Sequence, residues 1–310
     1  MKNVTYISVE LADKNRPAGR PPKTNWKIEL IKKGMKALQH ASPRKVAEVV
    51  WHFFTLPGKV YFSEPQKQLV SRARLGEMLY QGHKIVTYRW GTEGPRVLLC
   101  HGWRSKAADF RRMIESFLAA GYVVEAVDCR AHGQSEGKHS AMPEFRDILK
   151  EYILKNPTFN TIVGYSMGGA AVGVALSEVP VEKHPDKLFF VAAPPYVSYF
   201  FSDIIKDLGL KKSVYHKMTD MVEEVYGQPV DFFDLRTKTQ ELKNIPKHFL
   251  YCEDDETIPF KKGMELFELH QNAHFVQARG FGHYKILSHP EIIGYILEHT
   301  GEQQLVTVEV

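Results

Sequence analysis

A serine near the middle of the chain lies in a setting that can make it a nucleophile. The segment Gly164-Tyr165-Ser166-Met167-Gly168 has the pattern G-x-S-x-G, in which a sharp strand-to-helix turn pushes the serine hydroxyl out of a sheet. A strand-like run over residues 160–165 precedes the serine, and an Ala-rich, helix-like run follows it. A Gly-rich turn with an incidental serine is the alternative interpretation, so the pattern needs partners elsewhere in the chain.

A serine hydroxyl becomes nucleophilic when a histidine accepts its proton and a carboxylate orients that histidine. After a turn of this kind the acid is expected downstream, followed by the histidine. Asp254 and Asp255 follow the strand-like run 247–252, and Gly282-His283 follows the run 274–278. We therefore interpret His283, in a Gly-flanked loop, as the base and one of the two aspartates as the orienting acid. A solvated acidic turn and a surface histidine are the alternatives.

The negatively charged oxygen of an acyl-transfer intermediate needs two N–H donors aimed at it. The backbone N–H of Met167, at the start of the predicted helix, is one candidate. The other is the N–H of Trp103, in the loop His101-Gly102-Trp103-Arg104 after the strand-like run 96–100. The indole of Trp103 is expected either to wall a substrate pocket or to lie in the core.

These residues need a regular framework to hold them, and the sequence pattern indicates one. From residue 84 onward, short apolar runs alternate with helical patterns, which predicts a mostly parallel sheet with helices on both faces. Functional residues are then expected in loops at the carboxyl ends of the strands. The predicted strands are 84–90, 96–100, 122–127, 160–165, 187–193, 247–252 and 274–278, and the predicted helices are 107–120, 142–155, 167–178, 260–270 and 290–298.

Together the motifs resemble the α/β-hydrolase superfamily over residues 84–300. The resemblance rests, in chain order, on His101-Gly102, Asp128-x-Arg130-x-His132-Gly133-x-Ser135, the Gly164–Gly168 turn, Asp255-x-x-Ile258-Pro259 and Gly282-His283. It implies the α/β-hydrolase fold, with a mostly parallel eight-stranded sheet, and a Ser-His-Asp triad without metal or organic cofactor. Cys252 is a departure, because many members have glycine there, and the change affects the local turn rather than the triad.

Carried over by position, the resemblance implies that the triad is Ser166, Asp255 and His283, and so favours Asp255 over Asp254. It likewise implies that Trp103 and Met167 supply the oxyanion donors. The segment from Asp128 to Ser135 is usually structural in the family, and no catalytic role is expected for it.

A long insertion bears on the substrate. Residues 196–245 separate two predicted strands, and a connection of that length requires structure of its own, usually a functional lid. Its many aromatic residues predict a small helical cap over an apolar acyl pocket, although they can equally serve to pack the cap onto the body. The predicted pocket residues are Trp103, Tyr165, Tyr199 and Phe200.

The chain is thus expected to have four parts. A basic helical N-terminal extension covers 1–83, and the hydrolase core consists of 84–195 and 246–300. The cap is 196–245, and the tail is 301–310, where residues 304–310 alternate like a strand. Within the extension, helices are predicted from residue 26 and from Pro43, which is a favourable first-turn residue.

A serine at the turn predicts acyl transfer, because the dehalogenases and epoxide hydrolases that this sequence also resembles have aspartate at that position. We expect a carboxylesterase-like serine hydrolase acting on small to medium, fairly apolar acyl esters through an acyl-enzyme on Ser166. One alternative is a thioesterase or acyltransferase, with Lys211, Lys212 and Lys217 available to an anionic leaving group. Another is a catalytically silent ligand-binding or interaction module.

Composition limits the remaining classes. The 310 residues include only three cysteines and no C-x-x-C pair, which argues against a disulfide framework, and no metal site is predicted. No apolar leader or run of roughly 18 apolar residues is present, so a cytoplasmic location is expected. Residues 1–50 contain 11 Lys and Arg but 4 Asp and Glu. This basic arm predicts either weak peripheral membrane contact or a solvated helix face, and no nucleic-acid signature accompanies it.

Overall fold

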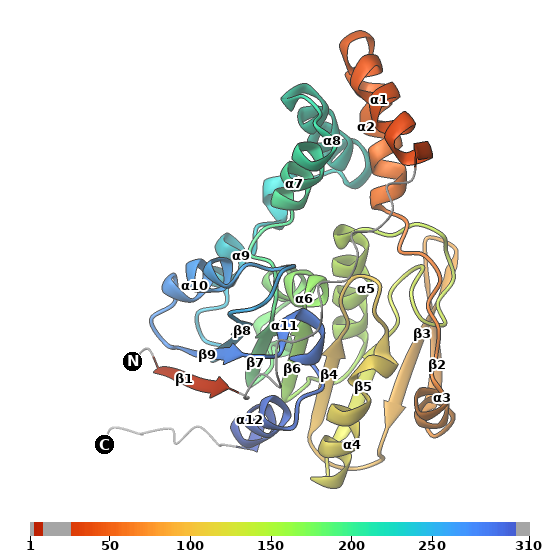
Figure 1. The fold of residues 1–310 in the computed structure, drawn as a ribbon. Helices are drawn as coiled ribbons and strands as arrows, with labels where there is room; N and C mark the ends of the chain where they lie inside the picture. Colours follow the sequence, from red (N-terminus) through yellow and green to blue (C-terminus); the bar gives the residue numbers. More distant parts are fainter. Residues whose placement is uncertain (1–2, 9–25, 302–310) are drawn as a thin grey trace.

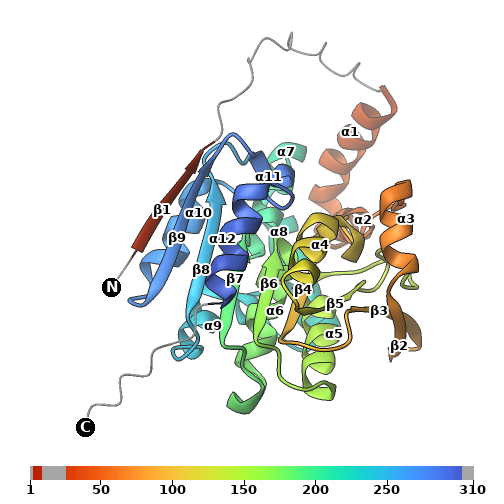
Figure 2. The ribbon, with the colours of Figure 1, turned by 90° about the horizontal axis from the view of Figure 1, so that it is seen from below.

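The computed structural model describes residues 3–8 and 26–301. Within these residues a nine-stranded sheet has the order β1-β9-β8-β7-β6-β4-β5-β3-β2, with β1 at one edge and β2 at the other (Figure 2). Strands β4 to β9 pair in parallel with one another. At the other end of the sheet, β3 pairs antiparallel with both β5 and β2. The strands are β1 (Asn3–Ser8), β2 (Arg74–Tyr80), β3 (His83–Trp90), β4 (Arg96–Cys100), β5 (Val123–Val127), β6 (Thr161–Tyr165), β7 (Lys187–Val191), β8 (Lys247–Cys252) and β9 (Ala273–Arg279).

The predicted sheet type is confirmed, but the described residues contain one strand more than the eight expected. Strands β2 to β9 make up eight, and β1 adds a ninth by pairing in parallel with β9. Both β1 and β2 lie in the extension that was predicted to be helical, and that expectation is wrong for them. Each is a partly exposed edge strand, so neither carries the apolar run by which a buried strand is recognised.

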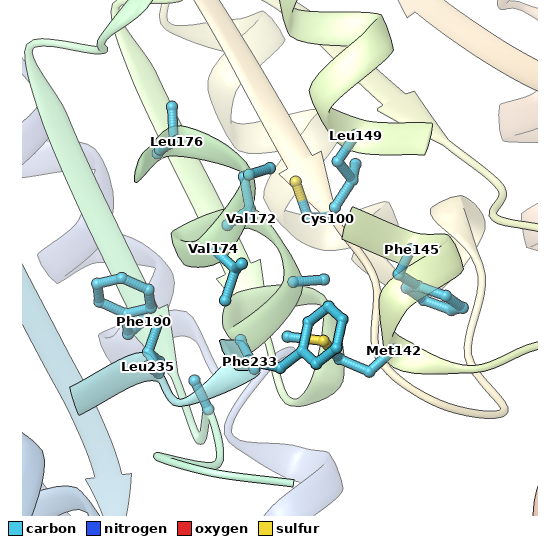
Figure 3. Close-up of a cluster of buried hydrophobic side chains, with 14 of the residues drawn as sticks. Cys100, Met142, Phe145, Leu149, Val172, Val174, Leu176, Phe190, Phe233 and Leu235 are labelled. Atoms are coloured by element: carbon cyan, nitrogen blue, oxygen red, sulfur yellow. The ribbon is translucent and has the colours of Figure 1, made fainter. Parts of the chain in front are cut away.

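Successive side chains of a strand point to opposite faces of the sheet. Both faces are apolar here, and helices cover both. In β4, Leu98 and Cys100 belong to one apolar core, in which Cys100 lies near residues of α5 and α6 (Figure 3). Val97 and Leu99 belong to a second core, which contains residues of α4 and α12. The helices are α1 (Trp26–Ala41), α2 (Pro43–Phe54), α3 (Glu64–Ser71), α4 (Arg111–Ala119), α5 (Met142–Lys155), α6 (Met167–Ser177), α7 (Ser198–Leu208), α8 (Lys212–Tyr226), α9 (Leu235–Glu241), α10 (Phe260–Glu268), α11 (Gly282–Lys285) and α12 (Pro290–Gly301).

The insertion 196–245 is helical and contains α7, α8, a 3-10 helix (Val230–Phe233) and α9. Helices α7 and α8 lie beside α1 and α2 at one end of the molecule (Figure 1). The boundaries at residues 83, 195 and 245 remain a prediction, and the strand expected over 304–310 lies outside the described residues. No helix in the described part of the chain is long and apolar enough to cross a bilayer.

Candidate active site

Ser166 occupies a strained turn between β6 and α6. Its φ of 50° and ψ of −127° lie where non-glycine residues are rare, and holding such a conformation costs about 1–3 kcal/mol. The turn is fixed because the Ser166 N–H donates to the carbonyl of Val191 at 2.8 Å. It also needs small neighbours, since a Cβ at Gly164 would collide with Gly169 and one at Gly168 with the carbonyl of His101. The glycines of the motif are therefore steric requirements.

His283 lies against this serine. Its Nε2 is 3.1 Å from Ser166 Oγ, and its Nδ1 is 2.8 Å from Asp255 Oδ2. All three side chains are buried. His283 was expected in a loop, but it lies in the one-turn helix α11. A helix of four residues has no repeating apolar pattern, so the sequence cannot indicate it.

The two neighbouring aspartates have different partners. Asp255 Oδ1 accepts the backbone N–H groups of Thr257 and Ile258, both at 2.8 Å, which leaves Oδ2 for the imidazole. Asp254 Oδ1 instead accepts the N–H of Gly280 at 2.7 Å and the thiol of Cys252 at 2.9 Å. Of the two candidates that the sequence leaves open, the structure brings Asp255 to the histidine.

The hydrogen-bonded order Asp255, His283, Ser166 is suited to removing the proton from the serine hydroxyl. A carboxylate on Nδ1 fixes the tautomer in which Nε2 of the imidazole is a proton acceptor, and it stabilises the imidazolium that forms. An imidazole in hydrogen-bond reach of a hydroxyl can then accept its proton as the oxygen attacks a carbonyl carbon. The geometry of Ser166, His283 and Asp255 meets both distance requirements.

The two expected oxyanion donors lie next to the serine. Met167 is the first residue of α6, so its N–H has no acceptor within the helix. Trp103 and Met167 line the same cavity as Ser166. The Trp103 loop lies so close to Ser166 that a Cβ at Gly102 would be 2.8 Å from the Cβ of Ser166.

Two buried histidines hold the Trp103 loop in place. His101 Nε2 accepts the N–H of Cys129 at 3.0 Å, and its Nδ1 donates to the carbonyl of Gly102 at 2.8 Å. His132 Nε2 accepts the N–H of Arg104 at 3.1 Å, and its Nδ1 donates to the carbonyl of Arg130 at 2.9 Å. Burial lowers the pKa of both rings, to about 3 for His132. Each histidine is therefore neutral and has one donor and one acceptor in use.

An apolar cavity of about 200 Å³ opens on Ser166 and His283. Of the four predicted pocket residues, Trp103 and Phe200 line it, but Tyr165 and Tyr199 do not. Tyr165 belongs to the core on the opposite face of the sheet, because it is the last residue of β6 and side chains alternate along a strand. The Tyr199 hydroxyl donates to the carbonyl of Thr257 at 3.3 Å instead.

Part of the cavity wall was not predicted from the sequence. Trp51 and Phe54, on helix α2, line the cavity together with Phe201, Val222 and Phe233 of the insertion. The available signal was the aromatic cluster Trp51-His52-Phe53-Phe54 at the end of a short amphipathic helix. Nothing local in that pattern distinguishes a pocket wall from a core face, since both are apolar.

Comparison with known proteins identifies the family to which the chain belongs. The family model "Alpha/beta hydrolase family" matches residues 97–293. The chain therefore belongs to the α/β-hydrolase family, which confirms the resemblance and the fold class predicted from the sequence. The matched range contains the serine turn, both aspartates and His283.

The alignments with individual relatives cover part of the chain or have low sequence identity. The chain is 35% identical over 102 residues to a monoacylglycerol lipase of Mycolicibacterium smegmatis, covering 29% of this chain and 36% of the relative. It is 24% identical over 242 residues to a bifunctional esterase/perhydrolase of Acinetobacter calcoaceticus, and this alignment covers 63% of this chain and 87% of the relative. The alignments with the first three curated relatives span 36%, 53% and 58% of their lengths. These relatives support hydrolase chemistry in general terms.

The solved structures agree on the fold. An esterase from Pyrococcus furiosus superposes with a TM-score of 0.57 at 20% identity, covering 79% of this chain and 94% of that one. A bromoperoxidase from Bacillus anthracis superposes with a TM-score of 0.56 at 19% identity, covering 74% and 99%. At such identities the likeness establishes the architecture alone.

Proposed function

We propose that this protein is a serine hydrolase that cleaves carboxylic esters of small to medium, fairly apolar acids. The observation that carries the proposal is the hydrogen-bonded sequence Asp255–His283–Ser166 on the wall of an apolar cavity. The cavity volume of about 200 Å³ is below the roughly 300–1,000 Å³ of pockets that hold drug-sized ligands. An acyl group of modest length suits that space.

In the proposed mechanism, Ser166 Oγ attacks the ester carbonyl carbon while His283 Nε2 accepts the hydroxyl proton. The N–H groups of Trp103 and Met167 stabilise the oxyanion of the tetrahedral intermediate. As the intermediate collapses, His283 donates its proton to the leaving alkoxide oxygen, and the acyl group stays on Ser166. A water then gives a proton to His283 and attacks the acyl-enzyme, which releases the acid and returns the proton to Ser166 Oγ.

A fluorophosphonate probe tests the proposal directly, because it reacts with activated serines. Intact mass spectrometry should find one adduct on the wild type and none on Ser166→Ala. The adduct should form far more slowly on His283→Ala. Ser140→Ala is a matched control, since Ser140 is another buried serine lining the same cavity, and it should label like the wild type.

Turnover then separates the outcomes. Hydrolysis of p-nitrophenyl butyrate that is lost in Ser166→Ala supports the ester assignment. A large preference for acyl-thioesters over matched esters would make the enzyme a thioesterase. Absence of any adduct on the folded wild type would overturn the proposal and favour a catalytically silent ligand-binding module.

We further propose that α1 and α2 make peripheral contact with anionic lipid. Helices α1 and α2 together contain six Lys and Arg residues and two Glu residues, and Leu30 and Phe53 are 61% and 63% exposed. Exposed apolar side chains beside lysines on a short helix are typical of interfacial binding, in which the apolar groups insert and the cations meet lipid phosphates.

A further inference from the structure

The N-terminal helix α2 packs against α8 of the insertion and shares its apolar core. Three residues on one side of α2, Val46, Ala47 and Val50, are almost completely buried. They belong to the same apolar core as Val214 and Met218 of α8, and α2 and α8 are in contact along this seam. Two segments more than 150 residues apart in sequence therefore form one apolar unit.

Polar contacts hold the α1–α2 segment against both ends of α8. Arg44 makes a bidentate ion pair with Glu224 near the end of α8, with N–O distances of 2.6 and 2.7 Å. At the other end of α8, the buried Gln39 of α1 accepts the backbone N–H of Lys211 through its side-chain oxygen at 2.7 Å. Beyond α2, the carbonyl of Thr55 accepts the N–H of Ser140, on the cavity wall, at 2.8 Å.

This placement turns two aromatic side chains of α2 toward the substrate cavity. Phe54 packs edge-on against Phe201 of α7, with ring centroids 5.1 Å apart, and Trp51 packs edge-on against the same ring at 6.1 Å. Both also line the cavity that contains Ser166. Figure 1 shows α2 beside the α7–α8 pair at the same end of the molecule.

We propose that α2 forms one wall of an acyl-chain site and that Trp51 sets the length of chain the enzyme accepts. The acyl chain would lie between α2 and the insertion, with its carbonyl carbon at Ser166. The N-terminal extension is then part of the substrate-binding cap rather than an appendage to the core. This inference rests on the proposed ester hydrolase function and specifies its substrate selectivity.

The expected size of the effect follows from methylene burial. Each methylene that gains an apolar environment contributes about 0.8 kcal/mol, or about fourfold in kcat/KM where the transition state retains it. Trp51 lines the cavity, so removing its indole enlarges the cavity, and Trp51→Ala should accommodate several further methylenes. The ratio of kcat/KM for p-nitrophenyl octanoate to that for the butyrate should rise at least about tenfold.

The experiment compares p-nitrophenyl acetate, butyrate, octanoate and decanoate on four proteins: wild type, Trp51→Ala, Phe54→Ala and Tyr215→Ala. Tyr215 is the matched control, because it is a half-buried aromatic residue of α8 that packs on the same core but does not line the cavity. Trp51→Phe serves as a milder variant if Trp51→Ala melts early. A chain-length optimum that moves to longer acids in the α2 variants and stays in Tyr215→Ala supports the inference.

Two further measurements distinguish failure of the chain-length role of Trp51 from failure of the proposed ester hydrolase function. Butyrate esters of methanol and octanol vary the alcohol, so their rate ratio should be the same in wild type and Trp51→Ala. Equal losses for every chain length would mean that Trp51 is only structural, and this inference would then fail while the serine mechanism stood. A wild type whose Ser166 never reacts with a small fluorophosphonate would instead refute the proposed function itself.

Discussion

The hydroxyl of Tyr165 donates a hydrogen bond of 3.0 Å to the backbone carbonyl of His283. The centroids of the two rings lie 5.3 Å apart. Tyr165, the residue before the proposed nucleophile, therefore contacts both the backbone and the ring of His283, the proposed base. Burial raises the pKa of Tyr165, which keeps its hydroxyl protonated and able to donate. This contact ties the end of β6 to α11 across the site.

Tyr165→Phe should therefore lower kcat about three- to tenfold with little change in KM. That range corresponds to the about 0.5–1.5 kcal/mol of a typical hydrogen bond, here lost from the positioning of His283. Steady-state kinetics on p-nitrophenyl butyrate, together with the rate of fluorophosphonate labelling, would measure it. A fall in thermal stability with unchanged kcat would assign Tyr165 to packing alone.

The adjacent aspartates offer a matched pair of substitutions. Asp255→Asn should reduce kcat by roughly 10⁴-fold, because an amide there stabilises the wrong tautomer of His283 and no imidazolium. Asp254→Asn should change kcat less than about threefold and cost about 1 kcal/mol of stability through weaker hydrogen bonds to Gly280 and Cys252. Kinetics and urea unfolding of both variants test this. Equal kinetic losses would mean that the two carboxylates act as one unit.

The buried histidines make the fold sensitive to acid. Burial lowers the pKa of His132 to about 3, whereas an unfolded histidine titrates near 6.5. Between these values the unfolded chain binds a proton that the folded chain does not, so stability falls as pH drops below about 6.5. One such group contributes a slope of up to about 1.4 kcal/mol per pH unit.

His132→Gln removes that group and should flatten the dependence, although it also lowers stability at pH 7.5 by disturbing the loop that holds Arg104. Urea unfolding between pH 7.5 and 4.5 provides the slopes. His216→Gln, on the exposed side of α8, is the control and should keep the wild-type slope. An unchanged slope in His132→Gln would show that this ring does not carry the acid sensitivity.

The sequence predicted most of what lies close to the serine. Strand and helix periodicity located β3 to β9 and the helices between them, because buried parallel strands are short continuous apolar runs. The order of serine, acid and histidine along the chain, each after a predicted strand, was enough to predict that Ser166, His283 and one of the two aspartates lie together. The choice between Asp254 and Asp255 rested on the resemblance, since the side-chain direction depends on hydrogen bonds to residues 257, 258 and 280.

The composite cap could not be predicted in the same way. Trp51 meets Phe201 through a contact that spans 150 residues of sequence, and no local pattern encodes such a pairing. The same limit applies to β1, whose partner β9 is also at the far end of the chain. Tyr165 was misplaced for a different reason, because a one-residue difference along a strand decides which face of the sheet its side chain occupies.

The exposed face of α1 and α2 leads to a prediction about lipid. Co-sedimentation should be measurable with vesicles of phosphatidylcholine containing about one third phosphatidylglycerol, and weak with pure phosphatidylcholine. Lys33→Glu should weaken binding at least about fivefold, since each basic residue near an anionic surface contributes about 1 kcal/mol, and added salt should act likewise. Phe53→Ser should weaken it by removing an inserting ring.

Leu79→Ser is the matched control for the vesicle experiment, because Leu79 is 71% exposed on β2 rather than on the N-terminal helices. It should bind vesicles like the wild type, which would locate the contact on α1 and α2. If Lys33→Glu, Phe53→Ser and Leu79→Ser all sediment as the wild type does, the basic helix face is simply solvated. The acyl-chain role of Trp51 would be unaffected, because that side chain faces the cavity and its test uses water-soluble esters.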